Sequence, residues 1–241
     1  MTTEQVLFIS DLHLDSQDPK TLQLFTDFLE RQARHAGSLY ILGDLFEVWL
    51  GDDDDSTFNR TVIQLLRALS DSGVDLYFMH GNRDFLIGEH FAAQAGCRLI
   101  EDPTRLTLFG HRLLLMHGDT LCTGDTQYQQ YRKMVRSTAW QQQVLAKSLD
   151  QRRLLAAQIR EQSLQQGQSK TYEIMDVEHK TVLDTLRQHQ VDYLIHGHTH
   201  RLNQHQEKYD NHQATRIVLG DWQTAPSYLL FSEEQVSLHR L

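Results

Sequence analysis

The sequence predicts an α/β fold with an active site at the ends of its strands. Short apolar runs alternate with segments of helical periodicity, and most runs end abruptly in Asp, Asn or His. In sheets of this class, ligands gather beyond the carboxyl ends of the strands. The 241 residues are 40% hydrophobic and can bury a sizeable core, so we expect a single domain over 1–241.

Six apolar runs are short enough to be buried strands and are rich in Val, Ile, Leu, Tyr or Phe. They are residues 6–10, 38–43, 75–81, 111–116, 191–197 and 215–220. Between them, residues 20–34 and 58–70 carry apolar side chains at three- and four-residue spacing, which predicts amphipathic helices.

The spacing of the polar groups indicates an insertion. His13, Asp44, Asn82 and His117 follow one another at distances of 31, 38 and 35 residues. The next group, at His198, lies 81 residues beyond His117. We therefore expect an inserted segment over 122–170. Residues 128–170 contain eight Lys or Arg, two acids and no proline, which predicts a basic helical cap.

Composition excludes several classes. The formal net charge of -9 argues against general nucleic-acid binding, and nothing implies an obligate protein partner. Cys97 and Cys122 form no CxxC motif, which fits a reducing compartment. The sequence predicts no signal peptide, and no run approaches the roughly 18 apolar residues of a membrane span. We expect a cytoplasmic protein.

The polar groups after the strands form a candidate metal site of oxygen and imidazole donors. This mixture suits a hard-to-borderline divalent cation. Seven donors exceed what one such ion takes from a protein, whereas two ions that share Asp44 would use them all and could activate water for phosphoryl transfer. Alternation in an extended segment would also admit His196. The seven candidate ligands are Asp11, His13, Asp44, Asn82, His117, His198 and His200.

The ordered motifs D-x-H, G-D, G-N-R-D, H-G-D and G-H-x-H resemble the calcineurin-like metallophosphoesterase superfamily. The resemblance implies an αββα sandwich of two mixed β-sheets flanked by helices, with a dinuclear centre at one edge. It assigns one metal to Asp11, His13, Asp44 and His200. It assigns the other metal to Asp44, Asn82, His117 and His198, so that His196 binds neither.

Seven blocks resemble one branch of this superfamily, whose members hydrolyse the pyrophosphate of UDP-2,3-diacylglucosamine in lipid A synthesis. The blocks are DLHL at 11–14, GDLFEVWLGDD at 43–53, HGNRDFLIG at 80–88, MHGD at 116–119, IMDV at 174–177, HGHTHRL at 196–202 and LGDW at 219–222. The resemblance implies two Mn²⁺ ions per chain and attack of water on the uridine-side phosphorus. The implied products are 2,3-diacylglucosamine 1-phosphate and UMP.

The same resemblance implies roles toward substrate. The catalytic residues would be Asp44, Arg83 and His198, because a guanidinium fork suits phosphate and His198 can contact that phosphate while it binds metal. The substrate-binding residues would be Asn82, Arg83, Asp125, Ser163, Lys170 and His198. The branch often has asparagine four residues after the serine, where this chain has Gly167, so that contact is absent.

Several nearby residues have more ordinary interpretations. Asp84 and Asp119 either orient a ligand or stabilise turns, and both interpretations stay open. We expect Asp52–Asp55 to point mostly to solvent. His80, His111 and His196 are interpreted as structural.

The cap also bears on function. Its basic residues are interleaved with Tyr131, Trp140 and other large apolar side chains, a mixture that suits anionic lipid headgroups and acyl chains. The resemblance implies a lipid-linked UDP-sugar substrate, and from the composition of the cap we expect peripheral association with an anionic membrane surface, at the cytoplasmic face of the inner membrane. A solvated helix face is the alternative. Two other functions stay open, a phosphoesterase for soluble dinucleoside polyphosphates or cyclic nucleotides, and a non-catalytic scaffold, which would usually lack ligands.

Overall fold

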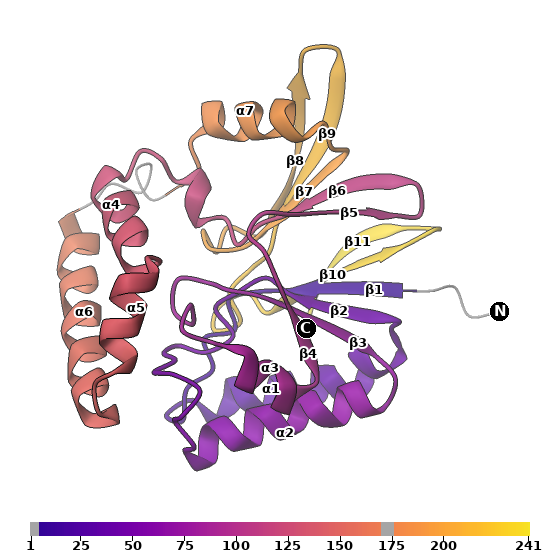
Figure 1. Cartoon of the computed structure of the whole chain (residues 1–241). Helices are drawn as coiled ribbons and strands as arrows, with labels where there is room; N and C mark the ends of the chain where they lie inside the picture. Colours follow the sequence, from indigo (N-terminus) through magenta and orange to yellow (C-terminus); the bar gives the residue numbers. More distant parts are fainter. Residues whose placement is uncertain (1–4, 170–175) are drawn as a thin grey trace.

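The chain folds into two β-sheets packed face to face between helices (Figure 1), and the computed structural model describes residues 5–169 and 176–241. The strands are β1 (Gln5–Ile9), β2 (Ser38–Ile41), β3 (Asp75–Met79), β4 (Cys97–Ile100), β5 (Thr104–Leu108), β6 (His111–Leu115), β7 (Tyr193–His196), β8 (Asn203–Tyr209), β9 (His212–Val218), β10 (Ser227–Ser232) and β11 (Val236–Arg240). The α-helices are α1 (Pro19–Arg31), α2 (Thr57–Asp71), α3 (Glu89–Ala95), α4 (Thr126–Val135), α5 (Thr138–Leu145), α6 (Leu149–Ser169) and α7 (His179–His189). Two 3₁₀ turns, η1 (Ala33–His35) and η2 (Asp119–Leu121), complete the fold.

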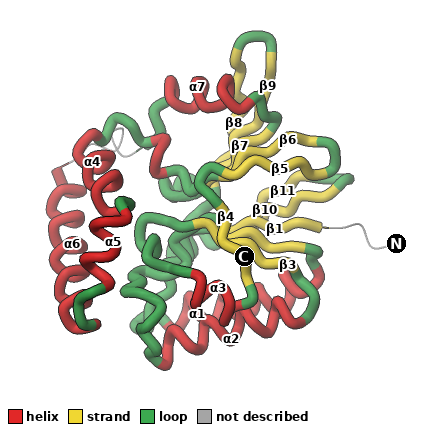
Figure 2. The backbone as a smooth tube through the Cα atoms, viewed as in Figure 1, coloured by secondary structure: helices red, strands yellow, loops and turns green. Residues whose placement is uncertain are grey.

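Both sheets are mixed. The six-stranded sheet has the order β11-β10-β1-β2-β3-β4, and the five-stranded sheet has the order β5-β6-β7-β9-β8. Strands β1 to β4 are parallel, as are β6, β7 and β9, whereas the remaining pairs are antiparallel. Helices α1, α2 and α3 cover one outer face and α7 covers the other (Figure 2). The predicted αββα sandwich is therefore confirmed.

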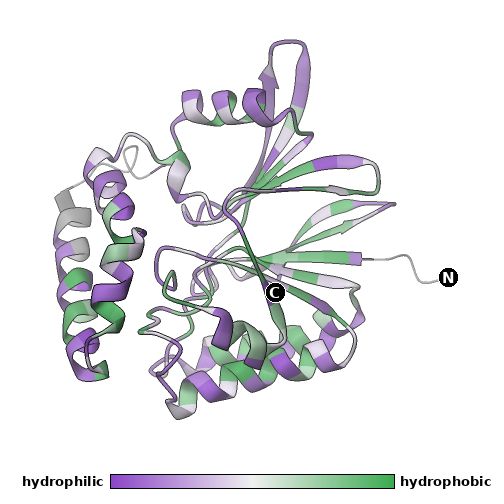
Figure 3. Cartoon of the chain, in the orientation of Figure 1, coloured by the Kyte–Doolittle hydropathy of each residue, from purple (hydrophilic) through white to green (hydrophobic). Residues whose placement is uncertain are grey.

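Alternation along the strands builds the layers. In β1, Val6 and Phe8 point into the core between the sheets, where they join Leu113 of β6. Leu7 and Ile9 point the other way, into the core beneath α1, α2 and α3. Figure 3 shows this apolar concentration along the strands, whereas the surface helices alternate in hydropathy. Because β1 is buried on both faces, the polar residues that follow it lie at its end.

The elements expected from sequence are present with small differences. All six apolar runs form strands, namely β1, β2, β3, β6, β7 and β9, and α2 matches the predicted helix 58–70 within one residue at each end. The helix expected over 20–34 ends earlier, because its last turn tightens into the 3₁₀ turn η1. Its start is fixed by Asp18, whose carboxylate accepts hydrogen bonds from two backbone N–H groups of the first turn.

The described part of the segment in which the sequence predicts an insertion, residues 122–169, contains the helices α4, α5 and α6. These helices stand beside the edge at which the parallel strands end, at the left of Figure 1. No helix in the two described stretches of the chain combines the length and the apolar composition that crossing a membrane requires.

Much of the positive charge of the insertion serves to dock it on the sandwich. Five of its arginines reach acceptors there, which the composition alone did not indicate. The pairs are Arg132 with Asp119 (2.7 Å), Arg136 with the Gly81 carbonyl (2.8 Å), Arg152 with Asp53 (2.5 Å), Arg153 with Asp54 (3.6 Å) and Arg160 with Glu47 (3.0 Å).

The acidic run Asp52–Asp55 was expected to point mostly to solvent, and this is wrong for Asp54, whose side chain is 12% exposed beside Arg153, and for Asp52. Its two oxygens accept from the backbone N–H groups of Gly88 and Phe91, at 3.0 and 2.9 Å, and so cap the start of α3. Gly88 precedes α3 and has no side chain with which to cap it, which explains why a carboxylate from a distant loop is needed. Asp55 is exposed, as expected.

Candidate metal centre and active site

The seven candidate ligands lie together at the edge where the parallel strands of both sheets end. Two come from the loop after β1, one each from the loops after β2, β3 and β6, and two from the loop after β7. In chain order they are Asp11, His13, Asp44, Asn82, His117, His198 and His200. The sandwich thus brings five separate loops to one place.

One group of donors surrounds His13. Its Nε2 lies 3.2 Å from Nε2 of His200 and 3.9 Å from Oδ2 of Asp44. The same atom of His200 lies 3.6 Å from Oδ1 of Asp11. Donor atoms this close together, from four side chains, are arranged to surround an ion. Among the described residues, two sets have donor atoms close enough together to hold a metal ion, namely Asp11, His13 and His200, and Asp11, Asp44 and His117.

A second group surrounds Asn82. Its Oδ1 lies 2.9 Å from Nε2 of His117 and 2.8 Å from Nδ1 of His198. The same nitrogen of His117 lies 3.8 Å from Oδ1 of Asp44. The two oxygens of Asp44 therefore face different groups, Oδ2 toward His13 and Oδ1 toward His117. Asp44 is placed as a bridge.

The backbone at these positions is unusual. Eight described residues other than glycine have positive φ angles, and five of them are candidate ligands. This conformation is uncommon for such residues and clusters at functional sites. The ligands with positive φ are Asp11, His13, Asp44, His198 and His200. Glycine lets two loops approach, since a methyl group on Gly81 would overlap the Asp44 carboxylate and one on Gly197 would overlap Asp11.

The electrostatics of the edge favour a cation. Burial opposes a charge on His117, yet the carboxylates of Asp44, Asp119 and Asp11 raise its pKa to about 9. By contrast, burial and the neighbouring His117 lower the pKa of His198 to about 4, which leaves a neutral imidazole. Oδ1 of Asp11 is fully buried and has no hydrogen-bond partner among the described residues. A buried carboxylate oxygen needs compensation, and a divalent cation supplies it.

Further groups hold the ligands in place. The carboxylate of Asp84 is fully buried and accepts from the backbone N–H of Asp44, Leu45 and Gly81, so it ties two ligand loops together. Nδ1 of His117 lies 2.9 Å from the Leu42 carbonyl, which leaves Nε2 to face the other donors. Asp84 was expected either to orient a ligand or to stabilise turns, and its contacts with backbone N–H groups support the second interpretation.

Asp119 has a different role from Asp84. Its buried carboxylate accepts from the Tyr128 hydroxyl at 2.9 Å and pairs with Arg132, both on α4. The ring of Tyr128 in turn stacks on His198, with centroids 5.7 Å apart. Asp119 therefore joins the loop after β6 to the insertion, and through Tyr128 the insertion touches a candidate ligand.

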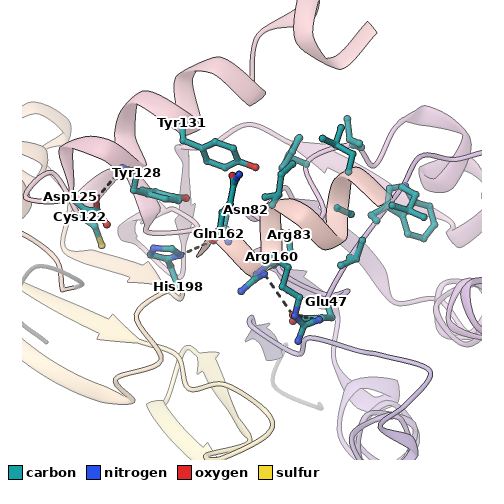
Figure 4. A pocket seen from close by; sticks show the side chains of 18 of the residues that line it. Glu47, Asn82, Arg83, Cys122, Asp125, Tyr128, Tyr131, Arg160, Gln162 and His198 are labelled. Carbon is teal, nitrogen blue, oxygen red and sulfur yellow. Dashed lines mark hydrogen bonds and ion pairs between the residues drawn. The ribbon is translucent and has the colours of Figure 1, made fainter. Parts of the chain in front are cut away.

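A cavity of about 810 Å³ opens between the sandwich and the insertion (Figure 4). Asn82, His198 and His200 form its metal end. Its walls are mainly apolar and aromatic, from Trp49, Leu50, Phe85, Leu86, Tyr131, Trp140, Val144, Leu155, Ala156 and Ile159. The cavity therefore suits a ligand whose polar group lies at the metal end and whose apolar group packs against the apolar walls.

The predicted substrate residues fall into three groups. Arg83 and Asn82 line the cavity, and the Arg83 Nε is buried without a hydrogen-bond partner in the described residues. Asp125 also lines it and caps α4, since its Oδ1 accepts from the Tyr128 N–H at 3.0 Å. Ser163 belongs to α6, but its side chain lies outside the described part of the structure, and Lys170 lies outside the described residues altogether.

Several cavity residues were given no role at the site by the sequence interpretation, among them Glu47, Tyr128 and Arg160. Glu47 lies within the block at 43–53, but an isolated Glu there gives no sign of its contacts.

His196 is fully buried. Its ring nitrogens contact the Gly197 carbonyl at 2.9 Å and Arg216 at 3.4 Å, and burial lowers its pKa to about 3. It packs as a neutral structural residue.

Comparisons with known proteins agree with this geometry. The calcineurin-like phosphoesterase family matches residues 5–202. A UDP-2,3-diacylglucosamine hydrolase of Chromohalobacter salexigens is 53% identical over 222 residues, which covers 92% of this chain and 89% of the relative. A protein of the same name from Escherichia coli is 46% identical and covers 96% of this chain and 97% of its own.

A UDP-2,3-diacylglucosamine hydrolase from Xanthomonas oryzae is 47% identical and covers 100% of this chain and 99% of the relative. Among solved structures, vacuolar protein sorting 29 from Cryptosporidium parvum is similar in fold alone, with a TM-score of 0.51, 12% identity and coverage of 99% of this chain and 97% of that one.

Proposed function

This chain belongs to the calcineurin-like phosphoesterase family, and from that premise we propose that it hydrolyses the pyrophosphate bond of UDP-2,3-diacylglucosamine in lipid A synthesis. The products are 2,3-diacylglucosamine 1-phosphate and UMP. The observation that carries this proposal is the joining of two features, a cluster of metal donors and an apolar cavity that begins at the same residues.

The donor groups fit two divalent cations, and we assign Mn²⁺ to both. Asp11, His13, Asp44 and His200 would hold one ion. Asp44, Asn82, His117 and His198 would hold the other. When bound, such a pair lowers the pKa of water and polarises a phosphoryl oxygen. The mixture of carboxylate, amide and imidazole donors suits a hard-to-borderline divalent cation, and the choice of manganese rests on the resemblance.

The side chains of the cavity orient the phosphates. Arg83 lies beside Asn82 at the metal end, and its guanidinium, on a side chain that is 32% exposed, supplies donors in a fork that matches phosphoryl oxygens. The neutral imidazole of His198 reaches the same region with its stacked neighbour Tyr128 behind it. Asp125, at the start of α4, would accept from a sugar hydroxyl or amide. Ser163 and Lys170 are proposed as further contacts from the resemblance alone.

The apolar part of the cavity would hold the acyl chains. Residues of α5 and α6 face Trp49, Phe85 and Leu86 of the sandwich across it. Burial of each methylene contributes about 0.8 kcal/mol, so two acyl chains supply ample binding free energy. This gives the insertion a function that a soluble nucleotide would not require.

We also propose that the insertion meets the cytoplasmic face of the inner membrane, where such a substrate resides. Three large apolar side chains are exposed on it, Met134, Leu145 and Leu154, the last at 67%. Lys133 and Lys147 are exposed on the same segment. Because several arginines dock the insertion on the sandwich, the apolar residues carry more of this proposal than the overall charge does.

The test is incubation of purified protein and Mn²⁺ with UDP-2,3-diacylglucosamine, followed by detection of UMP. We expect UMP and the acylated sugar phosphate in equal amounts. Hydrolysis of a dinucleoside polyphosphate or a cyclic nucleotide without release of UMP from the lipid substrate would leave only the family activity and remove the lipid assignment.

A further inference from the structure

Glu47 lies where the metal edge, the sandwich and the insertion meet (Figure 4). It follows β2 within the apolar stretch LFEVW and is only 8% exposed. A glutamate this deeply buried needs charged or hydrogen-bonding partners. Its partners come from three different parts of the chain.

The two carboxylate oxygens of Glu47 face different partners. Oε2 lies 3.0 Å from Nδ1 of His13, the ring nitrogen that points away from the other metal donors. Oε1 lies 3.0 Å from the Arg160 guanidinium and 3.7 Å from that of Arg83. One carboxylate therefore contacts a candidate metal ligand on one side and two cavity arginines on the other.

The backbone fixes Glu47 in this position. Its N–H donates to the Leu14 carbonyl at 3.1 Å, one residue beyond His13. Two residues further on, the Trp49 N–H donates to the Arg83 carbonyl at 3.3 Å. These two hydrogen bonds attach the segment that carries Glu47 to the loops after β1 and β3, and they fix the position from which its carboxylate extends.

We propose that Glu47 is a positioning residue that links the metal centre to the arginines of the phosphate end of the cavity. Its carboxylate lies 3.0 Å from Nδ1 and so orients the His13 ring with Nε2 toward the other metal donors. Its other oxygen holds Arg160, which comes from α6, beside Arg83. The identity of the substrate rests on the proposed function, whereas the link to His13 does not.

The first test measures metal binding without substrate. Metal-free protein is titrated with Mn²⁺ by calorimetry, and Glu47→Gln is expected to weaken binding by about 10- to 100-fold, as loss of a carboxylate behind a metal-bound histidine typically does. Arg160→Met is expected to leave the Mn²⁺ affinity unchanged. The matched control is Glu207→Gln, because Glu207 is also buried and pairs with an arginine, Arg216, at 3.0 Å, outside the cavity.

The second test measures the coupling to Arg160. At saturating Mn²⁺, Glu47→Gln and Arg160→Met should each raise KM for UDP-2,3-diacylglucosamine more than they lower kcat. The double variant should be no worse than the more severe single variant, because both remove one shared contact. Circular dichroism checks that each variant is folded. If Glu47→Gln does not fold, Glu47→Asp replaces it, since it keeps the charge but withdraws the carboxylate by one methylene.

Wild-type Mn²⁺ affinity in folded Glu47→Gln would overturn the proposal. So would KM effects that multiply in the double variant, or an equal loss of metal affinity in Glu207→Gln. Failure of the proposed function would be recognised separately, because wild-type protein would then release no UMP while the calorimetric comparison still decided the role of Glu47.

Discussion

The metal edge and the helical insertion form two walls of one cavity, but they are built in different ways. At the metal edge, each donor lies within a few residues of the end of a strand, and backbone hydrogen bonds such as those from Asp11 to Gly43 and from His13 to Asp44 join adjacent loops. The insertion has no strand to align it and relies on arginine side chains that reach the sandwich. The comparison indicates that the sandwich fixes the chemistry, whereas the insertion determines which substrate reaches it.

Removal of a metal ligand would test the first half of this comparison and should have the largest effect. His198→Ala or His200→Ala is expected to lower activity by more than about 100-fold, because loss even of an outer partner of a metal ligand costs about 10- to 100-fold. Metal content by elemental analysis should fall in parallel. His196→Ala, at the end of the strand that precedes this loop, is the matched control and should keep near-normal metal content. An emptied metal site in that control would contradict the ligand assignment.

Arg152 tests how the insertion is attached. It is 5% exposed and binds Asp53 together with the carbonyls of Leu50, Leu145 and Lys147. Arg152→Met is expected to destabilise this attachment by about 1.5–3 kcal/mol for each charged hydrogen bond that the substitution removes. KM for the lipid substrate should rise while Mn²⁺ affinity stays unchanged. Equal decreases in the affinity for substrate and for Mn²⁺ would show that the two regions are not separable.

Ile159 tests the apolar wall of the cavity. Ile159→Ala shortens the side chain on α6 and should lower kcat/KM for the diacylated substrate by about 10- to 200-fold, the effect of removing about 1–3 kcal/mol of apolar packing against the substrate. Val144→Ala in α5 is a second variant of the same wall. Steady-state kinetics with UMP detection provides the measurement, and an unchanged kcat/KM in both variants would remove the acyl chains from this cavity.

The smallest effect is expected at Leu154, which is 67% exposed. Leu154→Ser should change the free energy of unfolding by less than about 0.5 kcal/mol, as surface substitutions usually do. Co-sedimentation with anionic liposomes should nevertheless decrease, and Leu154→Ser with Met134→Ser should decrease it further. Undiminished sedimentation of the double variant would place the membrane contact elsewhere.

The sequence predicted the parts of the fold that have a local signal. The six strands that precede polar groups are apolar and short, so they could be identified. Strand β8 (NQHQEKY) is mostly polar and β5 (TRLTL) alternates in exposure, so neither has a strong signal, and both lie at sheet edges. Strand β10 is apolar but precedes no polar motif.

The candidate site likewise has residues that the sequence predicted and residues whose contacts it could not predict. Candidate ligands occur in recognisable motifs, whereas the contacts of Glu47 depend on Arg160, which is 113 positions further along and reaches it only when α6 docks. The same holds for Asp119, which pairs with α4. Interactions between the two regions depend on tertiary packing, and spacing along the chain does not predict them.

The most direct test of this account compares UDP-2,3-diacylglucosamine with UDP-glucosamine, which lacks both acyl chains, for wild-type protein with Mn²⁺. If the sandwich supplies the chemistry and the insertion selects the lipid, kcat/KM for UMP release should favour the diacylated substrate by at least about 100-fold, given about 0.8 kcal/mol for each buried methylene. Equal kcat/KM for the two substrates would contradict the account.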